Sequence, residues 1–125
     1  SLHHSVSHEE MCHLYSAHSL SLNIAELRDT YVLKQPIPKI HLRAFEIPMC
    51  GGLQFTSYNE EIARYFEEDK EIVLYRSTEE MIDKAKFYLD DKNSQLVRNM
   101  KLAARKRAEN EHTWTNRFNN IFNCL

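Results

Sequence analysis

The stretch from Arg43 to Tyr58, RAFEIPMCGGLQFTSY, decides the fold of this chain. It begins as a short helical segment that carries one acid, Glu46, and it reaches Cys50 just before both glycines of the chain. An apolar strand over residues 53–56 follows at once, and a polar loop comes next. This order of helix, glycine turn, buried strand and polar loop is typical of half of a nucleotide-binding α/β unit.

The glycine pair is expected to end the helix and to allow close packing. A glycine directly after a helix adopts the left-handed conformation at little cost, which favours a C-terminal cap at Gly51 and Gly52. A phosphate-binding loop would need more glycines, placed before a helix. Cys50 is expected to be a small packed residue and not a nucleophile, because the sequence places no histidine beside it.

Strands and helices alternate along the chain. Short apolar runs predict buried strands at about 20–24, 53–56 and 71–75. Periodic segments and two Ser-x-x-Glu capping boxes predict helices at about 8–17, 39–49, 59–66, 77–89, 94–110 and 113–123. Residues 25–38 contain two prolines and no clear period, so a loop is expected there. Alternation implies parallel strands with right-handed crossovers. The predicted fold class is α/β, a partial Rossmann-like domain of about three parallel strands flanked by helices.

Several short motifs, in this order and spacing, resemble one family of enzymes. They are Arg43-Ala44-Phe45-Glu46 with Cys50-Gly51-Gly52, then Glu71-Ile72-Val73-Leu74-Tyr75, Ser77-Thr78-Glu79-Glu80-Met81, and Glu111-His112-Thr113-Trp114 with Arg117. Together they resemble group 1 glycosyltransferases, which have two facing Rossmann-like domains (the GT-B fold), and most closely the CgeB-like branch. In the family Glu46 corresponds to the second of two glutamates, and the first would fall at position 38, which is Pro38 here. CgeB-like members also tend to lack the first glutamate, so this departure favours that branch over the commoner one.

The resemblance implies a glycosyltransferase that moves a glycosyl group from a nucleoside-diphosphate sugar to an unknown glycan, lipid or protein acceptor. Residues 1–125 would form one partial domain, the C-terminal half of the donor-nucleotide-binding domain. The N-terminal acceptor domain and the first strands would be missing, so we expect the chain alone to be inactive. No metal or other cofactor is implied. The alternative is a non-catalytic α/β module that binds a nucleotide or another protein, and the upstream gene sequence would separate the two.

Candidate ligand contacts lie at the carboxyl edge of the predicted sheet, where open parallel sheets bind ligands. Asn23 and Thr56 end two strands, and Lys39 and Arg43 flank the start of the helix that holds Glu46. The two bases suit a diphosphate through charge-assisted hydrogen bonds. In the family the acid holds the ribose, and a carboxylate can accept hydrogen bonds from both hydroxyls. An ordinary surface acid and a simple salt bridge remain open alternatives, and no catalytic residue is identified.

Composition narrows the possible partners and location. The net charge of −2 creates no field that would gather nucleic acid. The chain has no run of 18 apolar residues and no charged-then-apolar leader, which favours a cytoplasmic protein with, at most, peripheral contact at the inner membrane face. Cys12, Cys50 and Cys124 are scattered and odd in number, which predicts free thiols in a reducing compartment. The truncated sheet edge predicts self-association.

Histidines and bases offer weaker signals. Five of the seven histidines fall in the first 18 residues, but His8 and His13 have one residue too many between them for the zinc-protease motif, so no metal site is predicted. His112 is expected to have a structural role. A late basic patch, formed by Lys101, Arg105, Lys106 and Arg107, is either a solvated helix face or a contact for an anionic partner.

Overall fold

The computed structural model of the 125-residue chain describes residues 5–24 and 42–123. The elements in chain order are α1 (His8–Ala17), β1 (Ser21–Asn23), α2 (Arg43–Met49), β2 (Gln54–Ser57), α3 (Ile62–Tyr65), β3 (Val73–Tyr75), α4 (Thr78–Leu89), the 3-10 turn η1 (Asp91–Asn93), α5 (Ser94–Glu111) and α6 (Trp114–Asn123). All three predicted strands are present; β1 and β3 are two residues shorter than expected, and β2 has the expected length but is shifted by one residue. The predicted loop over residues 25–38, and the first residues of the helix expected at 39–49, lie outside the described residues.

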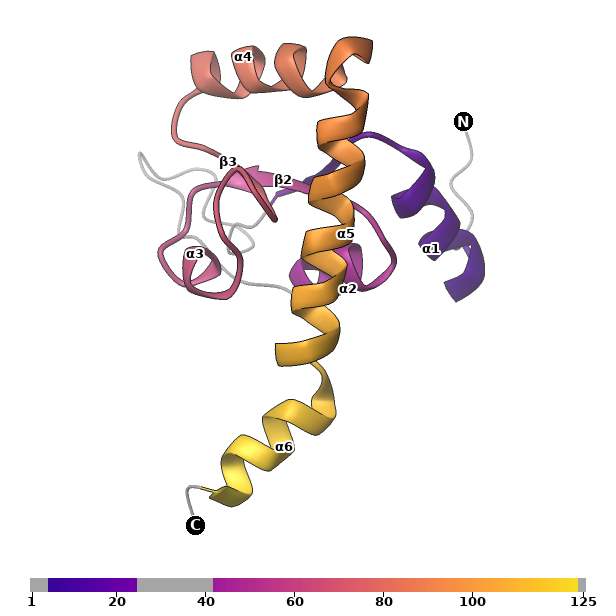
Figure 1. The fold of residues 1–125 in the computed structure, drawn as a ribbon, viewed down its shortest axis with the longest axis vertical. Coiled ribbons are helices and arrows are strands. Elements are labelled where there is room, and N and C mark those ends of the chain that lie inside the picture. The colour runs from indigo at the N-terminus through magenta and orange to yellow at the C-terminus, as the bar shows by residue number, and fades with distance from the viewer. Residues whose placement is uncertain (1–4, 25–41, 124–125) are drawn as a thin grey trace.

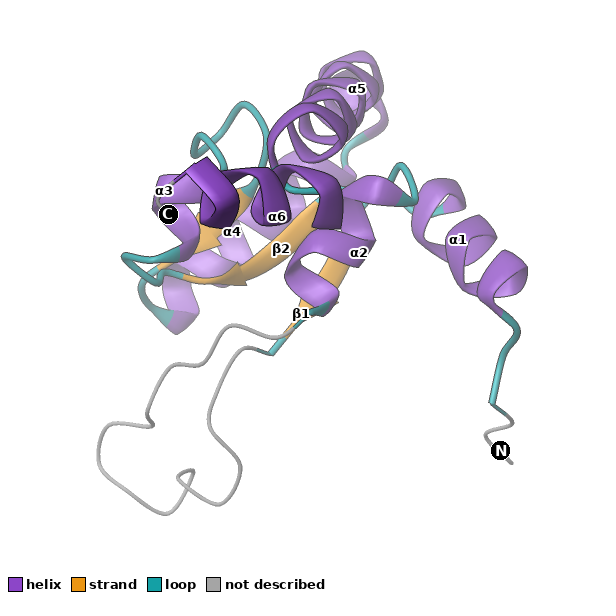
Figure 2. Cartoon of the chain, turned by 90° about the horizontal axis from the view of Figure 1, so that it is seen from below, coloured by secondary structure: helices purple, strands orange, loops and turns teal. Residues whose placement is uncertain are grey.

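The three strands form one parallel sheet in the order β1-β2-β3. Asn23 on β1 lies opposite Thr56 on β2, and Thr56 lies opposite Leu74 on β3. A hairpin between the last two strands would have made them antiparallel, so this register confirms the predicted α/β class. Figure 2 shows helices on both sides of the sheet.

Two separate apolar cores cover the two faces of the sheet. Val73 and Leu74 are neighbours on β3 and are both fully buried, although consecutive side chains of a strand point to opposite faces. On the Val73 face, β2 and β3 pack against α4 and the first half of α5, with Phe55, Tyr88 and Met100 in contact. The second core comprises Ala44, Ile62, Phe66, Ile72, Leu74 and Ala108. A sheet covered on both faces is what a parallel sheet requires.

Helix α5 belongs to both cores. Its residues Val97 and Met100 pack on one face of the sheet, and Ala108 reaches the other. Figure 1 shows α5 running along the molecule, with α6 extending beyond its end. The long helix therefore ties together the two layers that the sheet separates.

The glycine turn after α2 ends the helix as the sequence predicts. The Gly52 amide donates to the Ile47 carbonyl at 2.9 Å, and the Gly51 amide donates to the Pro48 carbonyl at 3.0 Å. Gly51 has φ +81°, in the left-handed region. These two bonds and this dihedral angle define a Schellman cap. The turn directs the chain from the end of α2 into β2.

The prediction of free thiols is wrong for two of the three cysteines. Cys12 on α1 and Cys50 at the end of α2 are joined as a disulfide, although 38 positions separate them in the sequence. Their sequence spacing gave no sign of the pairing, because only the packing of α1 against the glycine turn brings them together. Cys124 lies outside the described residues. The inference of a reducing compartment rested on free thiols and loses that support.

Candidate functional site

A small polar recess lies at the carboxyl edge of the sheet, between the strand ends and α2. We call it the edge recess; its volume is about 10 Å³, the space of about one water molecule. Its lining residues are Asn23, Ala44, Gln54, Thr56, Ser57, Asn59 and Ile62. Asn23, Gln54 and Thr56 are each at most 2% exposed. Three buried polar side chains beneath one short helix are unusual and require hydrogen-bond partners.

A chain of side-chain amides supplies two of those partners. The Asn23 Nδ2 group donates to Gln54 Oε1 at 2.7 Å, and Gln54 Nε2 donates to the Ala44 carbonyl at 3.5 Å. Asn23 Oδ1 in turn accepts from Arg43 Nη1 at 3.5 Å. The chain thus links the floor of the edge recess to both the backbone and a cation of the first turn of α2.

The hydroxyl of Thr56 is buried without a hydrogen-bond partner among the described residues. An unsatisfied buried hydroxyl costs about 1–3 kcal/mol. Thr56 lines the edge recess, so an oxygen or nitrogen entering from solvent can satisfy it. This is the kind of unfilled position that a ligand or an ordered water occupies.

The sequence-predicted site residues are brought together only in part. Asn23 and Thr56 share the edge recess, and Arg43 contacts Asn23 from the helix above. Glu46 is half-buried on α2 but does not line the recess, since it lies about 200° around the helix from Ala44. Its carboxylate makes no hydrogen bond or ion pair with the described residues. Lys39 lies outside the described residues.

Three polar lining residues were not among the predicted site residues: Gln54, Ser57 and Asn59. A signal for Gln54 was present, because a polar residue alternates with Thr56 inside an otherwise apolar strand. Alternation places both on the same face. The register with Asn23 on the neighbouring strand was needed to show that all three polar groups meet.

His112 has the structural role that was expected. Its Nε2 atom is 2.9 Å from the Tyr65 carbonyl, and its ring centroid lies 5.4 Å from that of Phe45 and 5.1 Å from that of Phe66. The imidazole therefore joins the end of α5 to α3 and to the first turn of α2. Phe45, the neighbour of Glu46, is thereby anchored, which fixes the side of α2 that faces the body of the domain.

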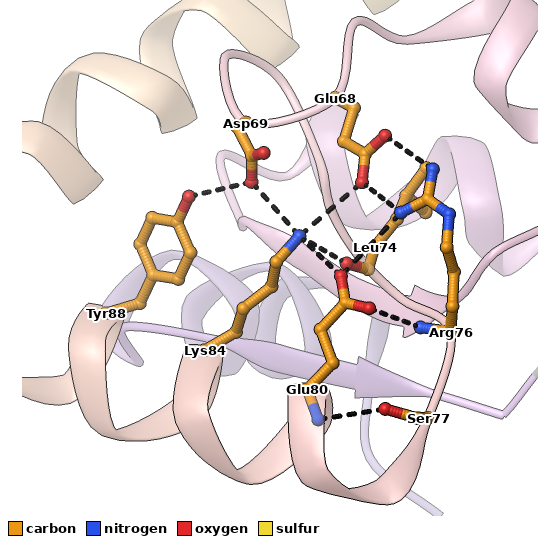
Figure 3. Close-up of polar contacts among 8 residues, drawn as sticks. All are labelled: Glu68, Asp69, Leu74, Arg76, Ser77, Glu80, Lys84 and Tyr88. Carbon is orange, nitrogen blue, oxygen red and sulfur yellow. Dashed lines mark hydrogen bonds and ion pairs between the residues drawn. The ribbon is translucent and has the colours of Figure 1, made fainter.

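A second polar cluster, on the turn before β3 and on α4, is fully paired and serves the fold. Lys84 Nζ donates to the Leu74 carbonyl at 2.6 Å and lies 3.2–3.5 Å from carboxylate oxygens of Glu80, Glu68 and Asp69 (Figure 3). Arg76 pairs with both oxygens of Glu68, at 2.7 and 2.9 Å. Every charge in it has a partner, so nothing in the cluster is left to bind a ligand.

The pKa values in this cluster follow from its pairing. The hydrogen bond from Arg76 lowers the pKa of Glu68, and burial opposes it without reversing it. Burial alone would lower the pKa of Lys84, but the hydrogen bond to Glu80 and the nearby carboxylates raise it. Burial, followed by the hydrogen bond to Asp69, raises the pKa of Tyr88. Each group therefore keeps its ordinary protonation state over a wider pH range than it would in water: Glu68 ionised, Lys84 protonated and Tyr88 neutral.

Most of the late basic patch is engaged within the chain. Arg107 pairs with Glu71 and Glu111, Arg105 pairs with Glu109, and Lys101 Nζ donates to the Ser16 carbonyl at 2.9 Å. These contacts favour the first alternative, a solvated helix face whose side chains also bind to neighbouring elements. They leave little free charge for an anionic partner.

The described part of the chain has neither a metal-binding cluster nor a membrane-spanning helix. Among residues 5–24 and 42–123, no group of three or more His, Cys, Asp or Glu side chains is arranged to hold a metal ion. No helix within those ranges is long and apolar enough to cross a membrane.

Three parallel strands covered by helices on both faces define a partial Rossmann-like α/β domain. A sequence model of the glycosyl transferase-like family matches residues 1–123, so the chain belongs to that family. Comparison with curated proteins and with solved structures finds no significant match. The family that the motifs predicted is thus confirmed at the level of a glycosyltransferase-like domain, and the CgeB-like branch stays a prediction.

Proposed function

We propose that this chain is part of the donor domain of a glycosyltransferase and binds a nucleoside-diphosphate sugar at the carboxyl edge of its sheet. One observation carries the proposal: the buried hydroxyl of Thr56 has no hydrogen-bond partner among the described residues, and Thr56 lines the edge recess together with Asn23, which accepts from Arg43. Membership of a glycosyltransferase-like family makes a sugar donor the natural ligand for such an edge.

The roles follow from the chemistry of each group. Arg43 has five N–H donors, so it can contact Asn23 with one and phosphate oxygens with others. The edge recess holds about one water, so the ligand lies across its mouth and sends one oxygen toward Thr56. Glu46 has no partner among the described residues and accepts the ribose hydroxyls from its own side of α2. Lys39 adds a second cation for the diphosphate.

The transfer step itself requires more than these residues. The acceptor, whether glycan, lipid or protein, needs a second surface that faces the donor. We expect no sugar transfer by the 125-residue chain alone, and the test of function is therefore donor binding.

Calorimetry on three ligands tests the proposal: a nucleoside, its diphosphate and the 2′-deoxy diphosphate. Arg43→Ala should weaken diphosphate binding about tenfold to a hundredfold, the value of a hydrogen bond to a charged group, and leave the nucleoside unchanged. Glu46→Gln should weaken both ribose forms by a similar factor, and the 2′-deoxy diphosphate should lose little further affinity in that variant.

Arg64→Ala is the matched control. Arg64 is an exposed arginine on α3 whose ion-pair partner among the described residues is Glu60, so its removal should leave all three affinities unchanged. Absence of diphosphate binding by the wild-type chain at millimolar concentration, across all common bases, would refute donor binding. Equal losses of diphosphate affinity in Arg43→Ala and Arg64→Ala would show that the loss comes from the change in net charge and not from a specific contact of Arg43.

A further inference from the structure

Helix α2 contains a proline that removes one of its own hydrogen bonds. Pro48 has no N–H group, so the Ala44 carbonyl four residues earlier has no donor within the helix. That carbonyl is not left unpaired, because Gln54 Nε2 donates to it at 3.5 Å from the neighbouring strand. A buried side chain of β2 therefore completes the backbone of α2.

The orientation of the whole amide chain is fixed by its two ends. The Ala44 carbonyl can only accept, so Gln54 must present its NH₂ group to α2 and its oxygen to Asn23. Asn23 must then donate to Gln54, which turns Asn23 Oδ1 toward the guanidinium of Arg43. Arg43 can only donate and therefore matches this end. No other assignment of the amide oxygens and nitrogens satisfies all four groups.

We propose that Gln54 and Asn23 are positioning residues for Arg43, and this rests on the proposed donor binding at the carboxyl edge. The long Arg43 side chain, on a seven-residue helix, can adopt many rotamers. Restricting it to one rotamer when the ligand binds costs conformational entropy and so weakens binding. The buried amide pair provides a fixed acceptor at the base of the guanidinium. Arg43 is held against Asn23, which lines the edge recess, before the diphosphate arrives, and its other N–H groups remain available to the ligand.

Two variants separate this role from simple support of the fold. Gln54→Met keeps the length and volume of the side chain but removes both ends of the amide. Pro48→Ala restores a helix N–H for the Ala44 carbonyl. In Pro48→Ala/Gln54→Met the backbone of α2 is satisfied again, so thermal stability should recover in large part. Asn23 still lacks its partner there, so Arg43 should remain unpositioned.

The first measurement needs no ligand. In nitrogen–proton NMR spectra, the Arg43 Nε–Hε signal, assigned by its loss in Arg43→Lys, should move and sharpen toward that of a mobile arginine in Gln54→Met. It should do the same in Pro48→Ala/Gln54→Met and remain near the wild-type position in Pro48→Ala. An unchanged Arg43 signal in folded Gln54→Met would overturn the proposal.

The second measurement is the diphosphate-to-nucleoside affinity ratio by calorimetry. The ratio should fall about tenfold in Gln54→Met and in Pro48→Ala/Gln54→Met, and Gln54→Met should cause no further fall in an Arg43→Ala background. If the losses in affinity ratio from Gln54→Met and Arg43→Ala are additive, Gln54 does not act through Arg43 and the proposal is overturned. It is also overturned if Pro48→Ala/Gln54→Met recovers the affinity ratio together with its stability. If the wild-type chain binds no diphosphate, donor binding fails, and the Arg43 signal alone then decides whether the amide pair holds the guanidinium.

Discussion

At the scale of single residues, the two glycines are required for different physical reasons. Gly51 has φ +81°, and an added Cβ would meet Ser16 at 3.6 Å, an ordinary van der Waals contact. An added Cβ at Gly52 would lie 2.9 Å from Ile47 and 3.0 Å from the backbone oxygen of Tyr15. The first position needs an unusual backbone conformation, and the second needs the absence of a side chain.

The two positions should therefore respond differently to substitution. Gly51→Ala should lower the free energy of unfolding by about 1 kcal/mol, and Gly51→Asn by less, because asparagine tolerates the left-handed region. Gly52→Ala should cost about 1–3 kcal/mol because α1 or α2 must shift. Urea unfolding followed by circular dichroism measures all three. A Gly52→Ala variant as stable as wild type would show that α1 does not pack against the turn.

Glu68 is a carboxylate whose charge should matter in acid. Its ordinary pKa is 4.5, and the hydrogen bond from Arg76 lowers the pKa in the folded state. A lowered folded-state pKa gives stability that is present above the ordinary value and is lost as the pH falls through the folded value. At pH 7, Glu68→Gln should reduce the free energy of unfolding by about 1 kcal/mol. The difference in unfolding free energy between wild type and Glu68→Gln should be smaller at pH 3 than at pH 7.

A surface ion pair provides the comparison for this prediction. Glu60 pairs with Arg64 one turn away on an exposed surface, so Glu60→Gln should change the unfolding free energy little at either pH. Urea titrations at pH 7 and pH 3 on the three proteins give the result. A larger difference in unfolding free energy between wild type and Glu68→Gln at pH 3 than at pH 7 would contradict a lowered folded-state pKa for Glu68.

Residue-scale features were predictable from the sequence when they were local. The Ser7–Glu10 capping box and the glycine cap involve residues within a few positions of one another, and both are present as expected. The hydrogen bond from Gln54 to the Ala44 carbonyl was not predictable. It depends on how β2 passes beneath α2, and no local rule relates Pro48 to a strand residue.

At the scale of elements, α1 is held mainly by its contacts with the α2–β2 turn. None of its residues is buried, and within the described part of the chain it is linked to the rest of the fold by a hydrogen bond from Lys101 to the Ser16 carbonyl. The disulfide between Cys12 and Cys50 fastens it to the end of α2. A helix with so little buried surface has a low cost of local opening once the covalent link is removed.

Reduction of the disulfide should therefore release α1 without unfolding the sheet. Hydrogen exchange followed by mass spectrometry should show faster exchange over residues 8–17 in dithiothreitol, with β2 and β3 unchanged. Cys12→Ser should behave like the reduced protein, and global stability should fall by at most about 2–4 kcal/mol, the entropic value of such a loop. Cys124→Ser is the control and should leave α1 protected. Equal protection of α1 before and after reduction would show that packing alone suffices.

The elements themselves were largely predictable, because periodicity and caps determine them locally. All three strands and the helices at 8–17 and 94–110 lie within a residue or two of the prediction. The helix expected at 59–66 is shorter, since α3 spans only Ile62–Tyr65. Asn59 accepts from the Glu61 amide and holds the preceding residues in a turn, so the helix begins late. Such side-chain turns compete with helix at asparagine.

At the scale of the whole molecule, the two edges of the sheet differ. On β3 the backbone of Leu74 points away from β2, because the carbonyl of Tyr75 next to it accepts from the amide of Tyr58, the residue that follows β2. Lys84 donates to that outward Leu74 carbonyl, and the Asp69 amide donates to the Ile72 carbonyl. The outer edge of β3 is therefore capped by a side chain and by a turn. Capping of this kind protects sheet edges from pairing with other chains.

The outer edge of β1 has no comparable cover among the described residues. Ser21 bonds inward to Leu53, so the backbone groups of Leu22 face outward. The Leu22 side chain is 52% exposed, and no described strand lies beyond β1. We therefore expect the chain to self-associate through β1 at high concentration. Light scattering should show a mass that rises with concentration from monomer toward dimer.

Two lysine substitutions separate edge pairing from general stickiness. Leu22→Lys places a charge on the open edge and should return the protein to a monomer at the concentration where wild type is dimeric. Ile82→Lys removes a side chain of similar exposure, 48%, from α4 and should leave the association unchanged, because α4 lies away from that edge. Equal effects of the two substitutions would assign the association to exposed apolar surface in general. A wild-type chain that stays monomeric at the highest soluble concentration would show that the β1 edge is satisfied within the monomer.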